Sequence, residues 1–428
     1  MLLRTFSLRP GATLGETRAF CRAGARRVSC GGGLLRSSSA GVDCPDARHE
    51  RCCVERGRVT MSPLVDIEVF SARISKKTVW TFIRALDGDG FCGWGEATLQ
   101  GEHAAVHAHA ALIKAPLIGE VPRPSSASCV VASTPEAAAT SAIDQALWDI
   151  SAQRIDKTLA DALGQRCRNA IELYANINRG TPNRSPSGFA ERAREATDAG
   201  FDAVKIAPFD DVIADNVGTS VGKELIAAGI ERVAAVRAAI GPGRRLLVDC
   251  HWRLTEASAR DVLRELEPCG LYWFECPLAE VPAMFPALRG LRSRANDIGV
   301  RLAGCETMTG VAAFESFLGA GVYDVVMPDV KYAGGLAEML RIADAAAKHG
   351  VLCSPHNPTG PIAHLHSVHI SSLLAEFPFL EFQYGESPLF FDIVEGDLPD
   401  PRSGTSTVPR GPGLGIGIDM AKLSSILE

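Results

Sequence analysis

The C-terminal part of the chain alternates between short apolar runs and longer amphipathic segments. The runs have the length and the β-branched or aromatic content of buried strands, and the segments between them, such as 189–200 and 335–350, carry apolar residues at helical spacing. The predicted strands are 171–176, 202–207, 245–251, 271–277, 300–306, 323–329, 350–356 and 380–386. Strands that alternate with helices favour a parallel sheet covered by helices. We therefore predict an α/β fold in which residues 171–386 form a TIM-like (β/α) barrel.

The segment before the barrel follows a different pattern, with alternating apolar and polar positions first and helical spacing later. The strands and helices predicted there are, in order, 65–74, 78–86, 91–98, 102–113 and 141–153. This order predicts an N-terminal α+β capping domain over residues 62–170, completed by residues 387–428. We expect the Pro- and Ser-rich piece 122–135 to be a loop near the barrel mouth.

Residues 1–61 match neither domain. They are rich in Arg and Ser and poor in acids, and they lack a sustained apolar period. This composition resembles an organellar transit peptide, but it also fits a disordered extension, or a start placed upstream of a true start at Met61. We favour the extension or the misplaced start and leave the segment out of the fold.

Composition and charge narrow the functional classes. The chain has 428 residues, of which 46% are hydrophobic and 22% charged, as in ordinary globular proteins. A net charge of −6 gives no reason to expect nucleic acid as a partner, and without an apolar run of about eighteen residues we expect no membrane span. The 13 cysteines include no CxxC pair, so we predict free thiols in a reducing compartment, the cytoplasm.

Three successive barrel strands are predicted to end on or beside an acid: Asp249, Glu275 and Glu306. The C-terminal ends of barrel strands share one rim, so these carboxylates should converge. Carboxylates that close do not all stay ionised unless a cation lies between them. Hard oxygen ligands with room for water and substrate favour Mg²⁺, and we predict a magnesium site on this rim. By strand parity Cys250, Cys276 and Cys305 point away from it and should be unreactive core residues.

The next two rim positions carry Asp329 and His356, each about thirty residues after its predecessor, as one strand–helix unit requires. A carboxylate beside a histidine fixes the tautomer of the imidazole and raises its basicity, so this pair is predicted to be a general base with its orienting group. His251 lies two residues after Asp249 and should face the barrel mouth with it. Lys205, at the end of the second strand, either loses its proton near neutral pH or holds a substrate carboxylate.

Several motifs follow one another along the chain: GWGEAT (93–98), AIDQALWDI (142–150), VDCHWR (248–253), FECP (274–277), the Glu306 strand, PDVKYAGG (328–335) and SPHNPTGPIA (354–363). In this order they resemble the enolase superfamily, specifically its mandelate racemase-like branch. The resemblance implies that Asp249, Glu275 and Glu306 bind Mg²⁺, which holds a substrate carboxylate. It also implies that a base removes the α-proton to give a metal-stabilised enediolate.

The D-x-H form of VDCHWR is similar to that of galactonate-type sugar-acid dehydratases, enzymes that yield 2-keto-3-deoxy acids. In that reading His251 is the general acid that protonates the departing β-hydroxyl, and His356 takes the α-proton. Glu386, in QYGES, would lie near the substrate carboxylate as a hydrogen-bond donor. The expected partner is a small acid sugar, an aldonate or aldarate, and the fold implies a homo-oligomer.

The sequence departs from this branch at two places, of which the first weighs against racemisation and the second leaves the substrate open. Ala207 replaces the second member of a basic pair that this branch often carries, and the loop 122–135 does not match the usual capping text. A racemase or epimerase using Lys205 and His356 is the main alternative, although the missing basic residue weighs against it. A metal-independent glycoside hydrolase and a non-catalytic binding protein remain as further alternatives.

Overall fold

The computed structural model describes residues 62–121, 123–125 and 131–428. These residues belong to one compact unit, Arg58–Glu428. The predicted N-terminal extension, 1–61, and residues 122 and 126–130 of the loop predicted over 122–135 lie outside the described residues. None of the helices in the described part is long and apolar enough to cross a membrane.

The N-terminal part contains the three predicted antiparallel strands, β1 (Leu64–Arg73), β2 (Val79–Asp87) and β3 (Cys92–Glu96), paired in that order. The helices that follow are α1 (His103–Leu117), α2 (Thr134–Arg154) and α3 (Leu159–Leu163). Helix α2 begins earlier than predicted because Ser133 caps its first turn by accepting the N–H of Glu136. Pro135 therefore lies in that first turn, where a missing N–H costs nothing, and not in a loop.

All eight predicted barrel strands are present in the described chain, most of them shorter than expected. They are β4 (Ala170–Asn176), β5 (Ala203–Ile206), β6 (Arg245–Asp249), β7 (Trp273–Glu275), β8 (Arg301–Gly304), β9 (Val325–Val326), β10 (Leu352–Cys353) and β11 (Leu380–Gln383). They pair in parallel in the order β10-β9-β8-β7-β6-β5-β4-β11. The two ends of this order meet where the N–H of Cys353 donates to the Glu376 carbonyl and Ser354 Oγ donates to the Phe379 carbonyl. The sheet is thus curled into the predicted barrel.

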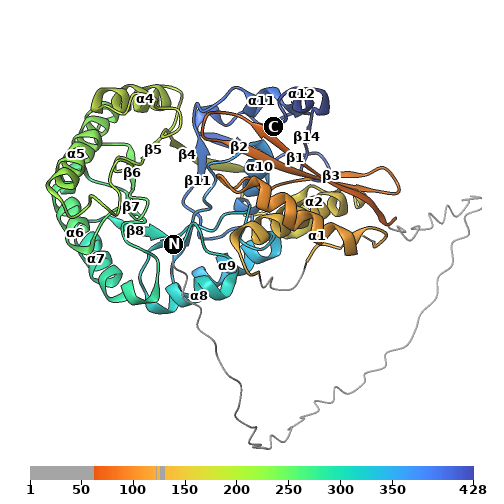
Figure 1. Cartoon of the computed structure of the whole chain (residues 1–428), viewed down its shortest axis with the longest axis horizontal. Helices are drawn as coiled ribbons and strands as arrows, with labels where there is room; N and C mark the ends of the chain where they lie inside the picture. Colours follow the sequence, from red (N-terminus) through yellow and green to blue (C-terminus); the bar gives the residue numbers. More distant parts are fainter. Residues whose placement is uncertain (1–61, 122, 126–130) are drawn as a thin grey trace, which may run out of the picture. The chain divides into compact units, whose positions relative to one another are not determined.

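The barrel helices lie outside the strands, as Figure 1 shows for α4 to α7. They are α4 (Pro186–Asp198), α5 (Ser220–Ile240), α6 (Glu256–Glu265), α7 (Phe285–Asp297), α8 (Val311–Ala320), α9 (Leu336–Lys348) and α10 (Pro361–Ser371), with short 3₁₀ turns at Glu267–Cys269 and Pro282–Met284. Inside the strands, a buried cluster that includes Tyr174, Leu247, Trp273 and Phe379 fills the barrel. The barrel is therefore a packed core whose chemistry is confined to its rims.

Helix α10 joins the N-terminal sheet to the barrel, since it contacts both β3 and β11 and every one of its residues is buried. Glu96, the last residue of β3, caps it from the other side of the junction. Its carboxylate accepts the N–H groups of Gly360 and Ala363, each at 2.9 Å. A negative side chain at a helix N-terminus satisfies otherwise unpaired donors and interacts favourably with the helix dipole.

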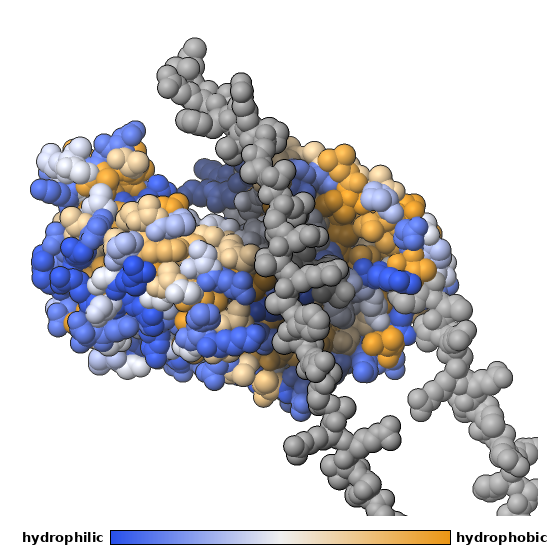
Figure 2. Space-filling view, turned by 90° about the horizontal axis from the view of Figure 1, so that it is seen from below, coloured by the Kyte–Doolittle hydropathy of each residue, from blue (hydrophilic) through white to orange (hydrophobic). Residues whose placement is uncertain are grey.

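The C-terminal residues return to both parts. The remaining elements are α11 (Leu389–Asp392), β12 (Val394–Glu395), a 3₁₀ turn Pro401–Ser403, β13 (Thr405–Thr407), β14 (Gly417–Ile418) and α12 (Met420–Ser424). Strand β13 pairs antiparallel with β4, and β12 pairs with β14. The end of the chain reaches β1, where Leu427 forms a bridge to Ala72. In Figure 2 the surface on the left of the view, over the barrel, is largely hydrophilic, and apolar residues gather on the right of the view.

Candidate active site

Asp249 and Glu275 end adjacent strands and are register partners, which brings their carboxylates to one level of the rim. Glu306 follows β8 after Cys305, which has φ +71°. All three side chains are almost fully buried. Burial together with the neighbouring Asp249 raises the pKa of Glu306 well above its usual range and that of Glu275 to about 7. The pKa of Asp249 is lowered, because His251 outweighs the effect of burial.

The ligand atoms of Asp249, His251 and Glu306 lie within 4.8 Å of one another. Glu306 Oε2 is buried and has no hydrogen-bond partner among the described residues. A buried carboxylate oxygen without a partner is costly, and a cation is the group that would satisfy it. The acids at this rim therefore fit a hard divalent ion.

Glu275 differs from the other two acids because both of its oxygens already accept hydrogen bonds. Lys205 Nζ donates to Oε1 at 2.7 Å and Trp273 Nε1 donates to Oε2 at 2.8 Å. Lys205 is itself buried and also pairs with Glu381 at 2.9 Å. Burial alone would lower the pKa of Lys205, but Glu275 and Glu381 raise it well above its usual range. The expectation that this ammonium loses its proton near neutral pH is therefore not met here, because two carboxylates hold the charge.

His356 and Asp329 form the predicted pair, with Nδ1 of the imidazole 2.7 Å from Oδ2 of the carboxylate. The same oxygen accepts Lys331 Nζ at 2.5 Å, and Tyr332 Oη lies 3.3 Å from Nδ1 of His356. Burial would raise the pKa of Asp329, but Lys331 and His356 lower it. The ionised Asp329 thus holds the Nδ1 side, and Nε2 lies 3.7 Å from Glu306 Oε2.

His251 lies beside Asp249, as predicted, but strand parity is not the reason. The strand ends at Asp249, and the next residues turn sharply, with φ +45° at His251 and +57° at Trp252. Nε2 of His251 lies 2.8 Å from Asp249 Oδ2, and Nδ1 lies 2.9 Å from Asp210 Oδ1. Burial would lower the pKa of this imidazole, but the two carboxylates raise it well above its usual range. Such a group is a proton donor at neutral pH.

The structure places Glu386 beside the β1–β2 hairpin. Its carboxylate accepts hydrogen bonds from Thr78 and Ser75, at the tip of the β1–β2 hairpin, and pairs with Arg179 at 3.3 Å. The carboxylate beside Lys205 is that of Glu381, whose Oε2 is also 4.0 Å from Nε2 of His356.

Sequence reasoning missed Glu381, Lys331 and Asp210. A glutamate inside the apolar run 380–383 was the available signal for the first, since a lone charge in a buried strand needs a partner. Lys331 lies two residues after Asp329 in PDVK, which was a signal for the second. Asp210 follows the second barrel strand, and no sequence pattern distinguishes it as a site residue.

The three rim cysteines are core residues, as predicted. Cys250, Cys276 and Cys305 are all buried, and burial raises the pKa of each thiol well above its usual range. They are therefore poor nucleophiles.

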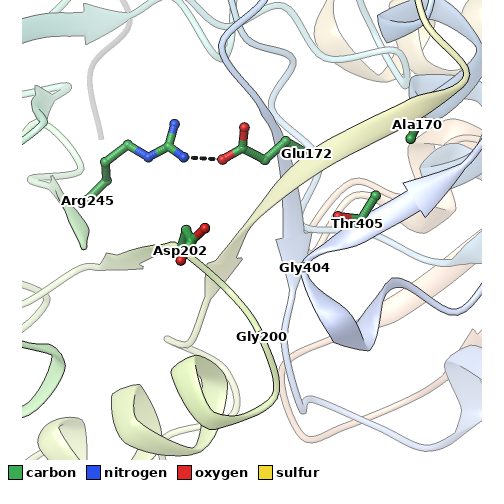
Figure 3. Close-up of a pocket in the computed structure, with 7 residues that line it drawn as sticks. All are labelled: Ala170, Glu172, Gly200, Asp202, Arg245, Gly404 and Thr405. Atoms are coloured by element: carbon green, nitrogen blue, oxygen red, sulfur yellow. Dashed lines mark hydrogen bonds and ion pairs between the residues drawn. The ribbon is translucent and has the colours of Figure 1, made fainter. Parts of the chain in front are cut away.

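A cavity of about 450 Å³ lies at the other end of the barrel. Figure 3 shows its lining: Ala170, Glu172, Gly200, Asp202, Arg245, Gly404 and Thr405. Arg245 is the first residue of β6, whose last residue is Asp249, so the cavity opens on the opposite rim from the acids. An ion pair between Arg245 and Glu172 crosses it. The rim with the acids and histidines is therefore the candidate active site.

Two protein families match the chain. The N-terminal domain of mandelate racemase and muconate lactonizing enzyme matches residues 59–164, and the enolase C-terminal domain-like family matches residues 188–422. D-gluconate dehydratase of Thermoproteus tenax is 31% identical over 283 residues, which are 66% of this chain and 55% of that protein. The chain thus matches about half the length of this relative. D-galactonate dehydratase of Verminephrobacter eiseniae is 30% identical over 300 residues, 68% of this chain and 75% of that protein.

Solved structures of similar fold include a mandelate racemase/muconate lactonizing enzyme-like protein from Rubrobacter xylanophilus. It superposes with a TM-score of 0.76 at 26% identity, covering 86% of this chain and 98% of that one. This agreement covers both the N-terminal sheet and the barrel.

Proposed function

The chain belongs to the mandelate racemase and muconate lactonizing enzyme family of the enolase superfamily, and from this premise we propose that it is a Mg²⁺-dependent sugar-acid dehydratase. The substrate is an aldonate or aldarate, and the product is a 2-keto-3-deoxy acid. The observation that carries the proposal is the presence of two histidines beside one acid cluster. His251 shares the cluster with Asp249 and Glu306, and His356 approaches Glu306 at 3.7 Å.

Asp249, Glu275 and Glu306 are the proposed ligands of the ion. The unpartnered Oε2 of Glu306 supports this assignment, because it is a buried negative atom without a donor. The raised pKa values of Glu275 and Glu306 also support it, because burial and the neighbouring Asp249 disfavour negative charge there and a cation would offset this effect. A bound Mg²⁺ would act as a Lewis acid on the substrate carboxylate and make the neighbouring C–H more acidic.

His356 is the proposed base. Asp329 accepts the Nδ1 proton, so Nε2 is the nitrogen with a free lone pair, and it faces Glu306 and Glu381. Lys331 keeps Asp329 ionised, which preserves this tautomer. Nε2 of His356 takes the α-proton of the substrate.

His251 is the proposed acid. Its proton goes to the β-hydroxyl, the carbon–oxygen bond breaks, and water leaves. The electrons of the broken α-C–H bond form the new double bond. The resulting enol takes up a proton at the β-carbon and becomes the 2-keto-3-deoxy acid.

The pairing of Lys205 favours dehydration over racemisation. A two-base racemase needs a second group that accepts or donates a proton on the opposite face of the α-carbon. Lys205 is tied as an ammonium to Glu275 and Glu381, and Ala207 offers no alternative base. We propose that Lys205 instead supplies fixed positive charge next to Glu275.

Incubation with a panel of aldonates and aldarates, with Mg²⁺ present, tests the function. We expect a 2-keto-3-deoxy acid from at least one member and loss of the activity after exhaustive chelation. A folded protein that yields no keto acid contradicts the proposal. In deuterated water, an epimerase would place deuterium at the α-carbon without loss of water. The activity of a metal-independent glycoside hydrolase would persist after chelation.

Self-association and a cytoplasmic location are further proposals. The fold implies a homo-oligomer, and the large exposed apolar side chains Val65 and Leu112 of the N-terminal part, at 56% and 72% exposure, are surfaces that a second copy would cover. Light scattering coupled to size-exclusion chromatography tests the first, and the localisation of a tagged chain tests the second.

A further inference from the structure

Each of the two active-site histidines contacts a carboxylate through Nδ1, and each of these carboxylates pairs with a positively charged side chain. Lys331, Asp329 and His356 form one such row. Arg184, Asp210 and His251 form the other, with Arg184 2.9 Å from Asp210 Oδ2 and Asp210 Oδ1 2.9 Å from Nδ1 of His251. The second row joins three loops, since Arg184 follows β4, Asp210 follows β5 and His251 follows β6.

The backbone of His251 is fixed independently of this row. Its N–H donates to Asp249 Oδ1 at 2.9 Å, and the N–H of Trp252 donates to the Cys276 carbonyl at 2.7 Å. Both residues have positive φ, a conformation that side chains other than glycine adopt at a cost and that persists only when the surroundings impose it. These hydrogen bonds fix the backbone from which the imidazole extends, but they leave the two side-chain torsions of His251 free. The orientation of the ring therefore depends on what its nitrogens contact.

Arg184 is anchored well enough to hold Asp210. Its guanidinium donates to the Ala207 carbonyl at 2.7 Å and to the Asn178 carbonyl at 3.2 Å, and it stacks over the Phe189 ring at 4.4 Å. The donors of a guanidinium form a planar, rigid fork, so these contacts set the position that it offers to Asp210.

We propose that Asp210, held by Arg184, is the positioning residue that orients the imidazole of His251 for its role as the acid. By accepting the Nδ1 proton, Asp210 fixes the ring so that Nε2 is the nitrogen presented to the acid cluster and to the departing hydroxyl. This inference rests on the proposed dehydration. It assigns to Asp210 the part that Asp329 has for His356.

The test compares Asp210→Ala and Asp210→Asn with the control Asp211→Asn. Asp211 is the neighbouring acid, is 49% exposed, and pairs with Arg232 at 2.8 Å. Asp210 is itself about a third exposed, with a side-chain exposure of 36%, so its replacement leaves the core intact. The first measurement is ¹⁵N-edited NMR of the Mg²⁺-loaded protein, with His251 assigned through a His251→Asn variant. We expect a hydrogen-bonded Nδ1 proton in the wild type and in Asp211→Asn, and its loss in Asp210→Ala.

The second measurement follows one sugar acid in deuterated water and counts two events, loss of water and deuterium at the α-carbon of recovered substrate. Asp210→Ala should eliminate water at least about tenfold more slowly, while His356 still exchanges the α-proton, so the ratio of exchange to elimination rises. Asp210→Asn keeps an oxygen that accepts the Nδ1 proton and should recover part of the elimination rate. A residue with a merely structural role would lower both events together.

Two results overturn the proposal: an unchanged Nδ1 resonance in Asp210→Ala, or an unchanged ratio of exchange to elimination. If the resonance responds as expected but the wild type dehydrates no sugar acid, the contact between Asp210 and His251 is real. In that case the proposed function is wrong, and with it the catalytic purpose assigned to the contact.

Discussion

Lys205 Nζ lies 2.7 Å from Oε1 of Glu275, and both side chains are buried in the barrel. The lysine also pairs with Glu381, so one ammonium compensates two carboxylates at the base of the acid cluster. This arrangement separates two kinds of positive charge. Lys205 is a permanent cation below the rim, and the unpartnered oxygen of Glu306 marks where a second cation would bind.

Replacing Lys205 with Met should destabilise the protein more than an ordinary surface change does. Removal of one member of a buried ion pair leaves its partners uncompensated, at a typical cost of about 3–5 kcal/mol. Urea unfolding in the presence of chelator measures the loss. Adding Mg²⁺ should restore part of the stability, because a divalent ion reduces the repulsion between Glu275 and its neighbours.

A matched control for this prediction is Lys114→Met, which removes an exposed pair with Asp66. Exposed pairs contribute about 0–1 kcal/mol, so this variant should unfold close to the wild type. Equal loss in the two variants would contradict the role assigned to Lys205.

Replacing His356 with Asn should slow turnover strongly without weakening the binding of Mg²⁺. A general base contributes about 10²–10⁴ in rate, so kcat should fall by that factor, and deuterium exchange at the α-carbon should fall with it. Mg²⁺ affinity, measured by titration calorimetry, should stay near the wild-type value. His349→Asn is the control, since His349 is exposed at the end of α9. Retained exchange in His356→Asn would mean that another group is the base.

Replacing Glu306 with Gln should have opposite effects on stability and on metal binding. The raised pKa of Glu306 means that the folded protein disfavours its charge, so its contribution lowers stability as the pH rises above the unfolded pKa of about 4.5. In chelator at pH 7, Glu306→Gln should therefore unfold at a higher urea concentration than the wild type. Its free energy of unfolding should be larger by roughly 1–3 kcal/mol, and this difference should shrink toward pH 4. Its stabilisation by added Mg²⁺ should be largely lost.

The same comparison distinguishes a metal ligand from a residue that only packs. If Mg²⁺ stabilises Glu306→Gln as strongly as it stabilises the wild type, Glu306 does not bind the ion. The test therefore consists of urea unfolding curves of both proteins, measured with and without Mg²⁺ at pH 7 and near pH 4.

The barrel and the positions of its rim acids could be predicted because the information for them is local. Each strand is an apolar run, and Asp249 and Glu275 terminate theirs, so a pattern over a few residues was enough. The strand ends were less accurate. His251 was expected to continue the strand, but its backbone has positive φ, a feature that no apolar pattern encodes.

Contacts between distant segments could not be predicted from such patterns. Glu381 on β11 meets Lys205 on β5 although β4 lies between their strands, and Asp210 meets His251 between two loops. The resemblance placed Glu386 near the substrate carboxylate, and in the structure its carboxylate contacts the β1–β2 hairpin through Thr78 and Ser75. Which of two glutamates in one short segment faces the site depends on where the strand stops, and that depends on its neighbours.

The buried histidines of α10, which lie outside the acid cluster, should make their own contribution to the pH dependence of stability. Burial lowers the pKa of His364 and His366 to about 3 and that of His369 to about 4. Their contacts fit neutral rings, since His369 accepts the Ala160 N–H at one nitrogen and lies 3.1 Å from the Leu414 carbonyl at the other. The unfolded chain gains protons at these groups below pH of about 6.5, whereas the folded chain does not.

Stability should therefore be constant in this respect above pH 6.5 and fall as the pH drops toward 4, by about 1.4 kcal/mol per pH unit for each histidine. His364→Phe removes one of these groups and keeps an aromatic ring against Phe382 and Phe390, whose centroids lie 5.5 Å from the imidazole. Urea unfolding of both proteins between pH 7 and pH 4 gives the slope of the free energy of unfolding against pH. This slope should be smaller in the variant by the amount that corresponds to one proton. Equal slopes would mean that His364 is protonated in the fold, which its burial among aromatic rings makes unfavourable.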